Sequence, residues 1–134
     1  MFDRWAEGGL LDLLQAEGMG CIAYSPLAQG LLSDKYLNGI PSGSRAAKEH
    51  GFLQESQVTS EKVEKARQLN EIARVRNQSL SQMAIAWLLK DDRITSVLVG
   101  ASSVEQLDDS LESLKNIAFS HEELQAVETI LAHD

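Results

Sequence analysis

The sequence is poor in the residues that mark secreted and membrane-embedded proteins. It has a single cysteine, Cys21, among 134 residues, so an internal disulfide is impossible and a reducing, cytoplasmic setting is expected. No segment approaches the roughly 18 consecutive apolar residues that span a bilayer. The beginning, MFDRWAEGG, lacks the charged-then-apolar layout of a secretory signal. We therefore expect no membrane partner.

Basic residues are also few relative to acidic ones. Lysine and arginine together number 12 against 20 aspartates and glutamates, which gives a net charge of −8. Nucleic acids and anionic membrane surfaces bind through positive fields, so neither is expected as the main partner. Any phosphate group that the protein holds must be bound by a few local groups. The 43% apolar and 24% charged residues fit one globular domain.

Apolar patterns predict the order helix, strand, long loop, two helices, strand and two further helices. The first helix is expected over residues 5–17, with Gly18 as its C-terminal cap. A buried strand over residues 19–24 follows and would bury Cys21 as a small apolar residue. The β-branched run ITSVLVG, residues 94–100, predicts the second strand.

Serine caps predict where several of the other helices begin. Helical periodicity starts at Ser60, and the patterns Ser-x-x-Gln or Ser-x-x-Glu at Ser79, Ser103 and Ser120 each precede an apolar stripe. Trp87 falls on such a stripe, so we interpret it as a core residue and not as a stacking platform.

Two buried strands separated by about 70 residues of mostly helical chain are typical of parallel β/α units. A parallel pair by itself has two open edges and cannot enclose a core. The chain is therefore expected to be an α/β structure that forms part of something larger. A small helical domain is the alternative if both strand predictions are wrong.

The two loops that follow the strands contain the candidate binding residues. In parallel β/α architectures, ligands lie beyond the carboxyl ends of the strands. The first loop brings Ser25, the backbone of residues 26–30, Lys35 and Arg45. The second loop, GASSVEQLDD, leads from Gly100 into a helix N-terminus, where free N–H groups and the helix dipole favour an anion. The alternative is an ordinary helix start with a lysine and an arginine in solvent.

Three segments carry a resemblance to a known family. YSPLAQGLLSDKY, GIPSGSRA and VLVGASSVEQLDDSL resemble the C-terminal cofactor-binding segments of the aldo-keto reductases, in the branch of bacterial L-glyceraldehyde 3-phosphate reductases and potassium channel β-subunits. The resemblance runs from FDRW to the final helix. It implies that residues 1–134 are a partial aldo-keto reductase domain: the C-terminal portion of a (β/α)8 TIM barrel, with its last two β/α units and end helix.

The resemblance implies NADP as the cofactor and assigns positions to it. The loop that wraps the pyrophosphate would consist of Ser25, Pro26, Leu27, Ala28 and Gly30. Lys35 would lie beside the phosphates, and Arg45 would stack on the adenine or reach the 2′-phosphate, tasks that suit its planar fork.

The second loop would hold the other end of the dinucleotide. Gly100 and Ser102 would bind the 2′-phosphate, and Gln106 and Asp109 would contact the adenosine. The family branch favours glutamate and asparagine where this chain has Asp109 and Ser110, so shorter or missing adenine contacts are expected there.

The resemblance also implies what the chain does not carry. The family's catalytic Asp, Tyr, Lys and His lie on earlier strands, so no catalytic residue is assigned, and neither Tyr24 nor Tyr36 is the acid. His50, His121 and His133 have no metal-ligand spacing.

The implied activity is reduction of small aldehydes or ketones, such as glyceraldehyde 3-phosphate or methylglyoxal, by hydride transfer from NADPH, with the chain alone inactive. The alternative is a non-enzymatic remnant that pairs with another barrel half or with itself as a homo-oligomer.

Overall fold

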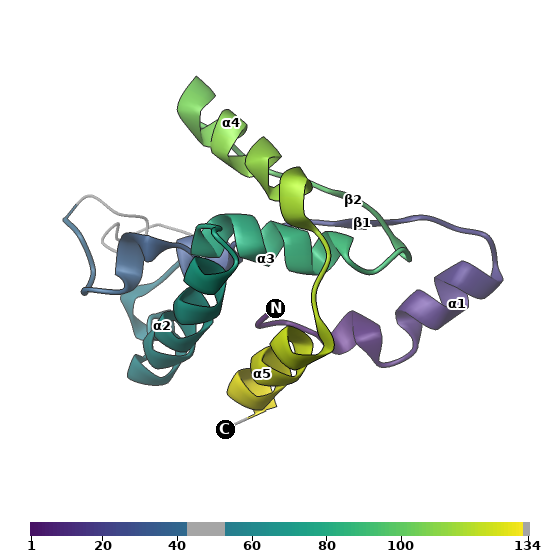
Figure 1. Ribbon diagram of the computed structural model, residues 1–134, viewed down its shortest axis with the longest axis horizontal. Helices are drawn as coiled ribbons and strands as arrows, with labels where there is room; N and C mark the ends of the chain where they lie inside the picture. The colour runs from purple at the N-terminus through teal and green to yellow at the C-terminus, as the bar shows by residue number, and fades with distance from the viewer. Residues whose placement is uncertain (43–52, 133–134) are drawn as a thin grey trace.

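The computed structural model describes residues 1–42 and 53–132 (Figure 1). Its two strands are β1 (Cys21–Ala23) and β2 (Ile94–Val97). The α-helices are α1 (Leu10–Ala16), α2 (Ser60–Val75), α3 (Leu80–Leu89), α4 (Val104–Glu112) and α5 (His121–Ala132). This order confirms the predicted one. In this part of the chain, no helix is both long and apolar enough to cross a membrane.

The strands β1 and β2 pair in parallel, as expected for β/α units. Ile22 pairs with Ser96 and Ala23 with Val97, with an irregularity in the register after Cys21. Both strands are shorter than predicted. A strand extends only as far as its hydrogen bonds to a neighbouring strand, and β1 and β2 each have one neighbour among the described residues. The alternative prediction of a small helical domain is therefore wrong.

Local capping explains where α3 and α5 begin. The N–H of Gln82 donates to Ser79 Oγ at 3.1 Å, and the N–H of Ser79 donates back to Gln82 Oε1 at 3.0 Å. The same reciprocal pair joins Ser120 and Glu123, at 3.2 and 2.8 Å. Each box satisfies N–H groups that a helix start leaves without partners. Both predicted helix starts are confirmed.

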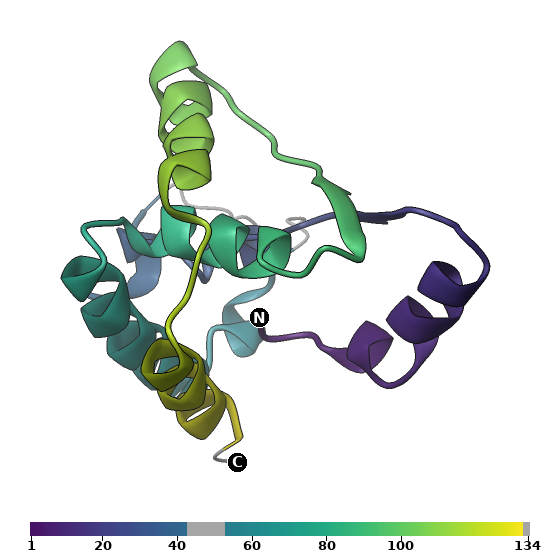
Figure 2. The same cartoon turned by 45° about the vertical axis from the view of Figure 1, so that its right-hand side comes forward.

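The core lies where α2, α3 and α5 pack together (Figure 2). Leu69, Met83 and Val127 are fully buried there, and Trp87 is 4% exposed, which confirms its prediction as a core residue. Burial of each large apolar side chain contributes about 1.5–3 kcal/mol. In Figures 1 and 2, α1 lies to one side of this core, and α4, which contacts α3, projects from it on another side.

A buried arginine joins the end of α2 to the segment before α5. The guanidinium of Arg76 donates to Glu123 Oε2 at 2.5 Å and to the carbonyls of Asn116 and Ala118 at 3.0 and 2.9 Å. It also lies 3.6 Å from the ring centroid of Phe119. These contacts fix the position of α5 against the core.

The predicted first helix is broken into two parts. A 3-10 turn at Trp5–Glu7 precedes α1, and Gly9 between them has a φ of 115°. That left-handed conformation ends the turn and prevents one continuous helix. Gly18, with a φ of 65°, closes α1 as predicted, since the N–H of Met19 donates to Leu14 O at 2.8 Å.

The strands and α4 are more exposed than the sequence suggests. Ile22 is 61% and Leu98 59% exposed, while Cys21 is only half-buried. On α4, Leu107 and Leu111 are 43% and 53% exposed. The prediction of buried strands is therefore wrong for this chain, because an apolar strand residue is buried only where another layer covers its face of the sheet.

Candidate cofactor site

The parallel sheet places the starts of the two predicted loops at the same end, where the carboxyl ends of both strands lie. Ala23 and Val97 pair at the ends of β1 and β2, and the N–H of Leu98 donates to Ala23 O at 2.8 Å. The loop after each strand therefore starts beside the other, and both strands run toward the same side in Figure 1. Residues that are about 70 positions apart in the sequence are therefore adjacent at the carboxyl end of the sheet.

The first loop has an unusual backbone. Ser25, Ala28 and Gln29 have φ values of 52°, 47° and 60°, and Gly30 has a φ of 102°. Left-handed conformations are uncommon for residues with a side chain, and each costs about 1–3 kcal/mol. Such strain persists only where the surrounding structure enforces it, and it is concentrated at ligand sites.

Apolar anchors hold this loop in place. Leu32 is fully buried, Tyr36 is 2% exposed and Pro26 is also buried. The N–H of Gly30 donates to Leu27 O at 2.8 Å, which closes the turn between the anchors. These anchors and this hydrogen bond therefore define the shape of the loop.

Lys35 provides a free positive charge on this loop. Ser33 caps the short turn at Asp34–Tyr36: its hydroxyl accepts from the N–H of Lys35 at 3.3 Å and donates to Gly30 O at 2.6 Å. The Lys35 side chain is exposed and forms no ion pair with any residue that the structure describes. Arg45, the other predicted cation, lies outside the described residues.

The second loop ends at the N-terminus of α4. Ser103 Oγ accepts from the N–H of Gln106 at 3.3 Å, which confirms this helix start. Gln106 Oε1 accepts from both the N–H and the hydroxyl of Ser102, each at 2.9 Å. Gly100 is exposed, and an added Cβ would meet nothing within 4 Å. Space for a close backbone contact exists here.

A carboxylate already occupies the N-terminal end of α4. Hydrogen bonds from its own backbone N–H and from the Ser103 hydroxyl lower the pKa of Glu105. The first turn of α4 thus stabilises a negative charge, as the helix dipole and free N–H groups favour. A phosphate at the same place would compete with Glu105.

The residues that were predicted to contact the adenosine already form hydrogen bonds within the chain. Asp109 Oδ1 accepts from Gln82 Nε2 at 2.7 Å, which joins α4 to α3. Ser110 Oγ donates to the backbone carbonyl of Gln106 at 2.9 Å. For Asp109 to contact a nucleotide, its bond to Gln82 must be lost or shared.

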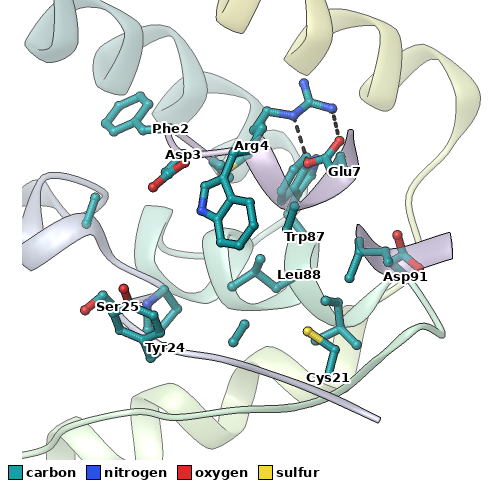
Figure 3. A pocket seen from close by; sticks show the side chains of 18 of the residues that line it. Phe2, Asp3, Arg4, Glu7, Cys21, Tyr24, Ser25, Trp87, Leu88 and Asp91 are labelled. Atoms are coloured by element: carbon teal, nitrogen blue, oxygen red, sulfur yellow. Dashed lines mark hydrogen bonds and ion pairs between the residues drawn. The ribbon is translucent and has the colours of Figure 1, made fainter. Parts of the chain in front are cut away.

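A cavity of about 610 Å³ lies beside β1 (Figure 3). Among the predicted residues, Ser25, Pro26 and Ala28 line it, but Lys35 and Ser102 do not. Its walls are mostly apolar and come from β1, α1, α3 and the first seven residues. The cavity therefore does not unite the two predicted loops, whose first residues lie side by side at the carboxyl end of the sheet.

Three charged groups on the cavity wall, Arg4, Glu7 and Asp91, form ion pairs. Arg4 Nε donates to Glu7 Oε1 at 2.9 Å, and this hydrogen bond lowers the pKa of Glu7. Asp91 is paired with Arg93 at 2.6 Å. In Figure 3, Arg4 and Glu7 point toward one another. Asp3 and Lys90 also line the cavity and form no ion pair with the residues that the structure describes, and Lys90 Nζ lies 4.4 Å from the ring centroid of Trp87.

Two residues near the first loop were missed by the sequence analysis. Tyr24 directly follows β1, is 79% exposed and lines the cavity. The Gln29 amide donates to Ser25 Oγ at 3.3 Å and so fixes the serine. An aromatic residue directly after a strand was the available signal for Tyr24, whereas the role of Gln29 depends on its left-handed backbone.

No group of three or more His, Cys, Asp or Glu side chains that could hold a metal ion occurs in residues 1–42 and 53–132. His121 begins α5. His50 and His133 lie outside the described residues.

A family model described as the aldo/keto reductase family matches residues 1–132. The chain belongs to the aldo/keto reductase family. This confirms the resemblance drawn from the sequence motifs.

Relatives agree with this membership. The chain is 50% identical over 136 residues to an L-glyceraldehyde 3-phosphate reductase of Escherichia coli O157:H7, and 49% identical to that of strain K12. It is 34% identical over 129 residues to a putative voltage-gated potassium channel subunit beta of Schizosaccharomyces pombe. These matches cover 98%, 98% and 93% of this aldo/keto reductase chain, but 39%, 39% and 38% of the relatives.

A solved structure shows a similar arrangement. A thermostable aldo-keto reductase crystallised with the inhibitor epalrestat matches with a TM-score of 0.64 and 27% identity, over 96% of this chain and 36% of that one. The aldo/keto reductase chain described here thus spans about two fifths of the length of the proteins that it matches.

Proposed function

We propose that residues 1–134 are the NADP-binding, C-terminal part of an aldo-keto reductase that reduces small aldehydes and ketones, such as glyceraldehyde 3-phosphate or methylglyoxal-like compounds. One observation supports this proposal above the others. The strained loop that follows β1 and the segment that leads from β2 to α4 start side by side at the carboxyl end of the sheet. Reductases among the relatives supply the reaction type.

The residues at this edge fit a dinucleotide with several negative charges. The backbone of residues 25–30 would surround the pyrophosphate, and the free ammonium of Lys35 would lie beside it. Gly100 and Ser102 would bind the 2′-phosphate at the start of α4, where Glu105 already shows that a negative charge is accommodated. Bound NADPH would supply the hydride for carbonyl reduction.

The 2′-phosphate end requires a local rearrangement. Gln106 Oε1 now accepts two hydrogen bonds from Ser102. A phosphate oxygen would take over these two donors, since charged acceptors form stronger hydrogen bonds than a neutral amide. Gln106 would then be free to contact the adenosine.

Catalysis is not assigned to residues of this chain. Reduction requires a proton donor next to the carbonyl oxygen as well as the hydride donor. We propose that the donor lies in the three fifths of the relatives that this chain does not cover. Mixed with NADPH and either glyceraldehyde 3-phosphate or methylglyoxal, chain 1–134 should therefore give no turnover above the buffer rate. Turnover well above that rate would refute this assignment.

The test of the cofactor site is a titration of chain 1–134 with NADPH and with NADH, followed by nicotinamide fluorescence. We expect tighter binding of NADPH. Lys35→Ala should weaken it by about threefold to tenfold, because an exposed charged hydrogen bond contributes about 1 kcal/mol. Lys62→Ala is the matched control, since Lys62 lies beside Arg4 and Glu128 at a different pocket.

Equal affinity for both dinucleotides would contradict the 2′-phosphate site. Equal effects of the two lysine substitutions would contradict the role of Lys35.

A further inference from the structure

An asparagine-glycine pair follows the short turn that carries Lys35. Of the four asparagines in the sequence, only Asn38 precedes a glycine. Asn38 and Gly39 are both exposed, and the Asn38 side chain forms no hydrogen bond with the residues that the structure describes. The side-chain amide is therefore accessible to water and can rotate toward the backbone that follows it.

The backbone at this pair leaves the nitrogen of Gly39 open to approach. Gly39 has a φ of 113°, and a Cβ added to it would meet nothing within 4 Å. Its N–H donates to Tyr36 O at 3.3 Å, which lies beyond the usual range of about 2.7–3.2 Å and indicates a weak bond. Since glycine has no side chain to obstruct its own nitrogen, the Asn38 amide carbon can reach that atom.

Contacts with α2 keep this turn in place on the folded chain. The guanidinium of Arg67 donates to Leu37 O through Nε at 3.0 Å and through Nη2 at 2.7 Å. Tyr36, one residue earlier, is 2% exposed. The chain is thus fixed up to Leu37, whereas the asparagine and glycine after it are at the surface. Two groups held next to each other react much faster than separate molecules, so a reaction between them does not require unfolding.

We propose that Asn38 is a site of spontaneous deamidation in the folded chain. The backbone nitrogen of Gly39 attacks Asn38 Cγ and gives up its proton. A bond forms between this nitrogen and Cγ, the bond between Cγ and Nδ2 breaks, and the amide group leaves with the proton as ammonia. Water then opens the resulting succinimide ring at one of its two carbonyls, which leaves aspartate or isoaspartate at position 38. Asparagine is among the residues that limit the durability of proteins through such chemistry.

The new carboxylate lies beside Lys35. The N–H of Leu37 donates to Asp34 O at 3.3 Å, and the N–H of Gly39 continues this i,i+3 pattern to Tyr36 O. Residues three apart in a 3-10 turn eclipse each other, which places position 38 next to the lysine. A carboxylate there competes with the cofactor phosphates for the ammonium, so NADPH binding weakens as the protein ages. This consequence rests on the proposed cofactor role of Lys35, whereas the deamidation does not.

The test is incubation of chain 1–134 at neutral pH, followed by proteolysis and mass spectrometry. We expect the peptide that contains Asn38 to exchange NH2 for OH and to include isoaspartate. Asn77 is the internal control: it is also exposed and has a φ of 54°, but the N–H of the next residue, Gln78, donates to Ala73 O at 2.9 Å. Asn77 should stay intact. Gly39→Ala should slow the reaction at Asn38 about tenfold or more, because its Cβ obstructs the attacking nitrogen.

Two results would overturn the proposal. One is an intact Asn38 after the time in which a peptide of residues 36–41 is converted. The other is conversion of Asn77 at the same rate, which would indicate reaction in the unfolded chain.

The effect on the cofactor is measured with matched aspartate variants. Asn38→Asp is one of the two products, and Asn77→Asp adds the same charge far from Lys35. Asn38→Asp should weaken NADPH binding by about twofold to fivefold, as expected for one exposed ion pair, and Asn77→Asp should not weaken it. Conversion of Asn38 without any change in NADPH affinity would uphold the deamidation site and refute the proposed role of Lys35.

Discussion

Replacing Arg76 by methionine tests whether its buried network positions α5. The side chain of Arg76 is 2% exposed, and it donates to Glu123, Asn116 and Ala118. A methionine side chain fills much of the space that the aliphatic part of the Arg76 side chain occupies. It carries no charge and no hydrogen-bond donor. The substitution therefore leaves the carboxylate and the carbonyls without these partners while creating little empty space.

The magnitude follows from what each acceptor retains. Removal of one partner of a buried ion pair typically costs about 3–5 kcal/mol. Glu123 keeps the N–H of Ser120 at 2.8 Å, and Asn116 O keeps the Gln78 amide at 3.0 Å. Ala118 O and Gln78 Oε1 lose the donors that Arg76 provided. We therefore expect a loss near the lower limit, about 3 kcal/mol in the free energy of unfolding.

The assay is urea unfolding followed by circular dichroism. With a slope of roughly 1–3 kcal/mol per molar urea, a loss of about 3 kcal/mol lowers the midpoint by about 1–3 M. The control is Arg74→Met on the same helix. Arg74 and Glu71 form an i,i+3 pair in which both side chains are 68% exposed, and such pairs contribute about 0.2–1 kcal/mol. If Arg76→Met were no more destabilising than Arg74→Met, the buried network would not support α5.

Three further predictions concern Gly30, the α-amino group of Met1 and Glu105. Gly30→Ala should destabilise the chain by about 1–2 kcal/mol in urea unfolding because of the φ of 102°, whereas Gly100→Ala, in open space, should change stability by less than about 0.5 kcal/mol. Burial lowers the pKa of the Met1 α-amino group to about 6, so the unfolded chain binds more protons between pH 6 and 8. Stability should therefore rise over that range, by about 2–3 kcal/mol; a flat profile of unfolding free energy would contradict this. Glu105→Gln should strengthen NADPH binding by about twofold to fivefold in the fluorescence titration because it removes a negative charge from the start of α4, and Glu112→Gln, at the other end of α4, should not.

Local chemistry explains which features could be predicted from the sequence. The starts of α3 and α5 follow from Ser79 and Ser120, because a capping box needs only residues three positions apart. The end of α1 at Gly18 is also a local feature, because glycine readily adopts the left-handed backbone that ends a helix. The stripe that contains Trp87 identified the core, since helical spacing places those side chains on one face. The motifs after β1 and β2 were sufficient to indicate the family.

Other features depend on contacts between residues that are far apart in the sequence. Nothing in the vicinity of Asp109 predicts its bond to Gln82, and the loop motif does not predict the left-handed backbone of Ser25 and Ala28. The exposure of Ile22 could not be predicted either, because an apolar residue in a strand is buried only if another layer covers it.

The sequence by itself determined the starts of α2 to α5, the apolar stripes and the family, because each is encoded in short segments that act through local hydrogen bonding and periodicity. Tertiary structure alone decided the register between β1 and β2 and the burial of Arg76 against the segment before α5. These depend on chain segments that meet only after folding, when burial and pairing bring together groups 40 or more residues apart.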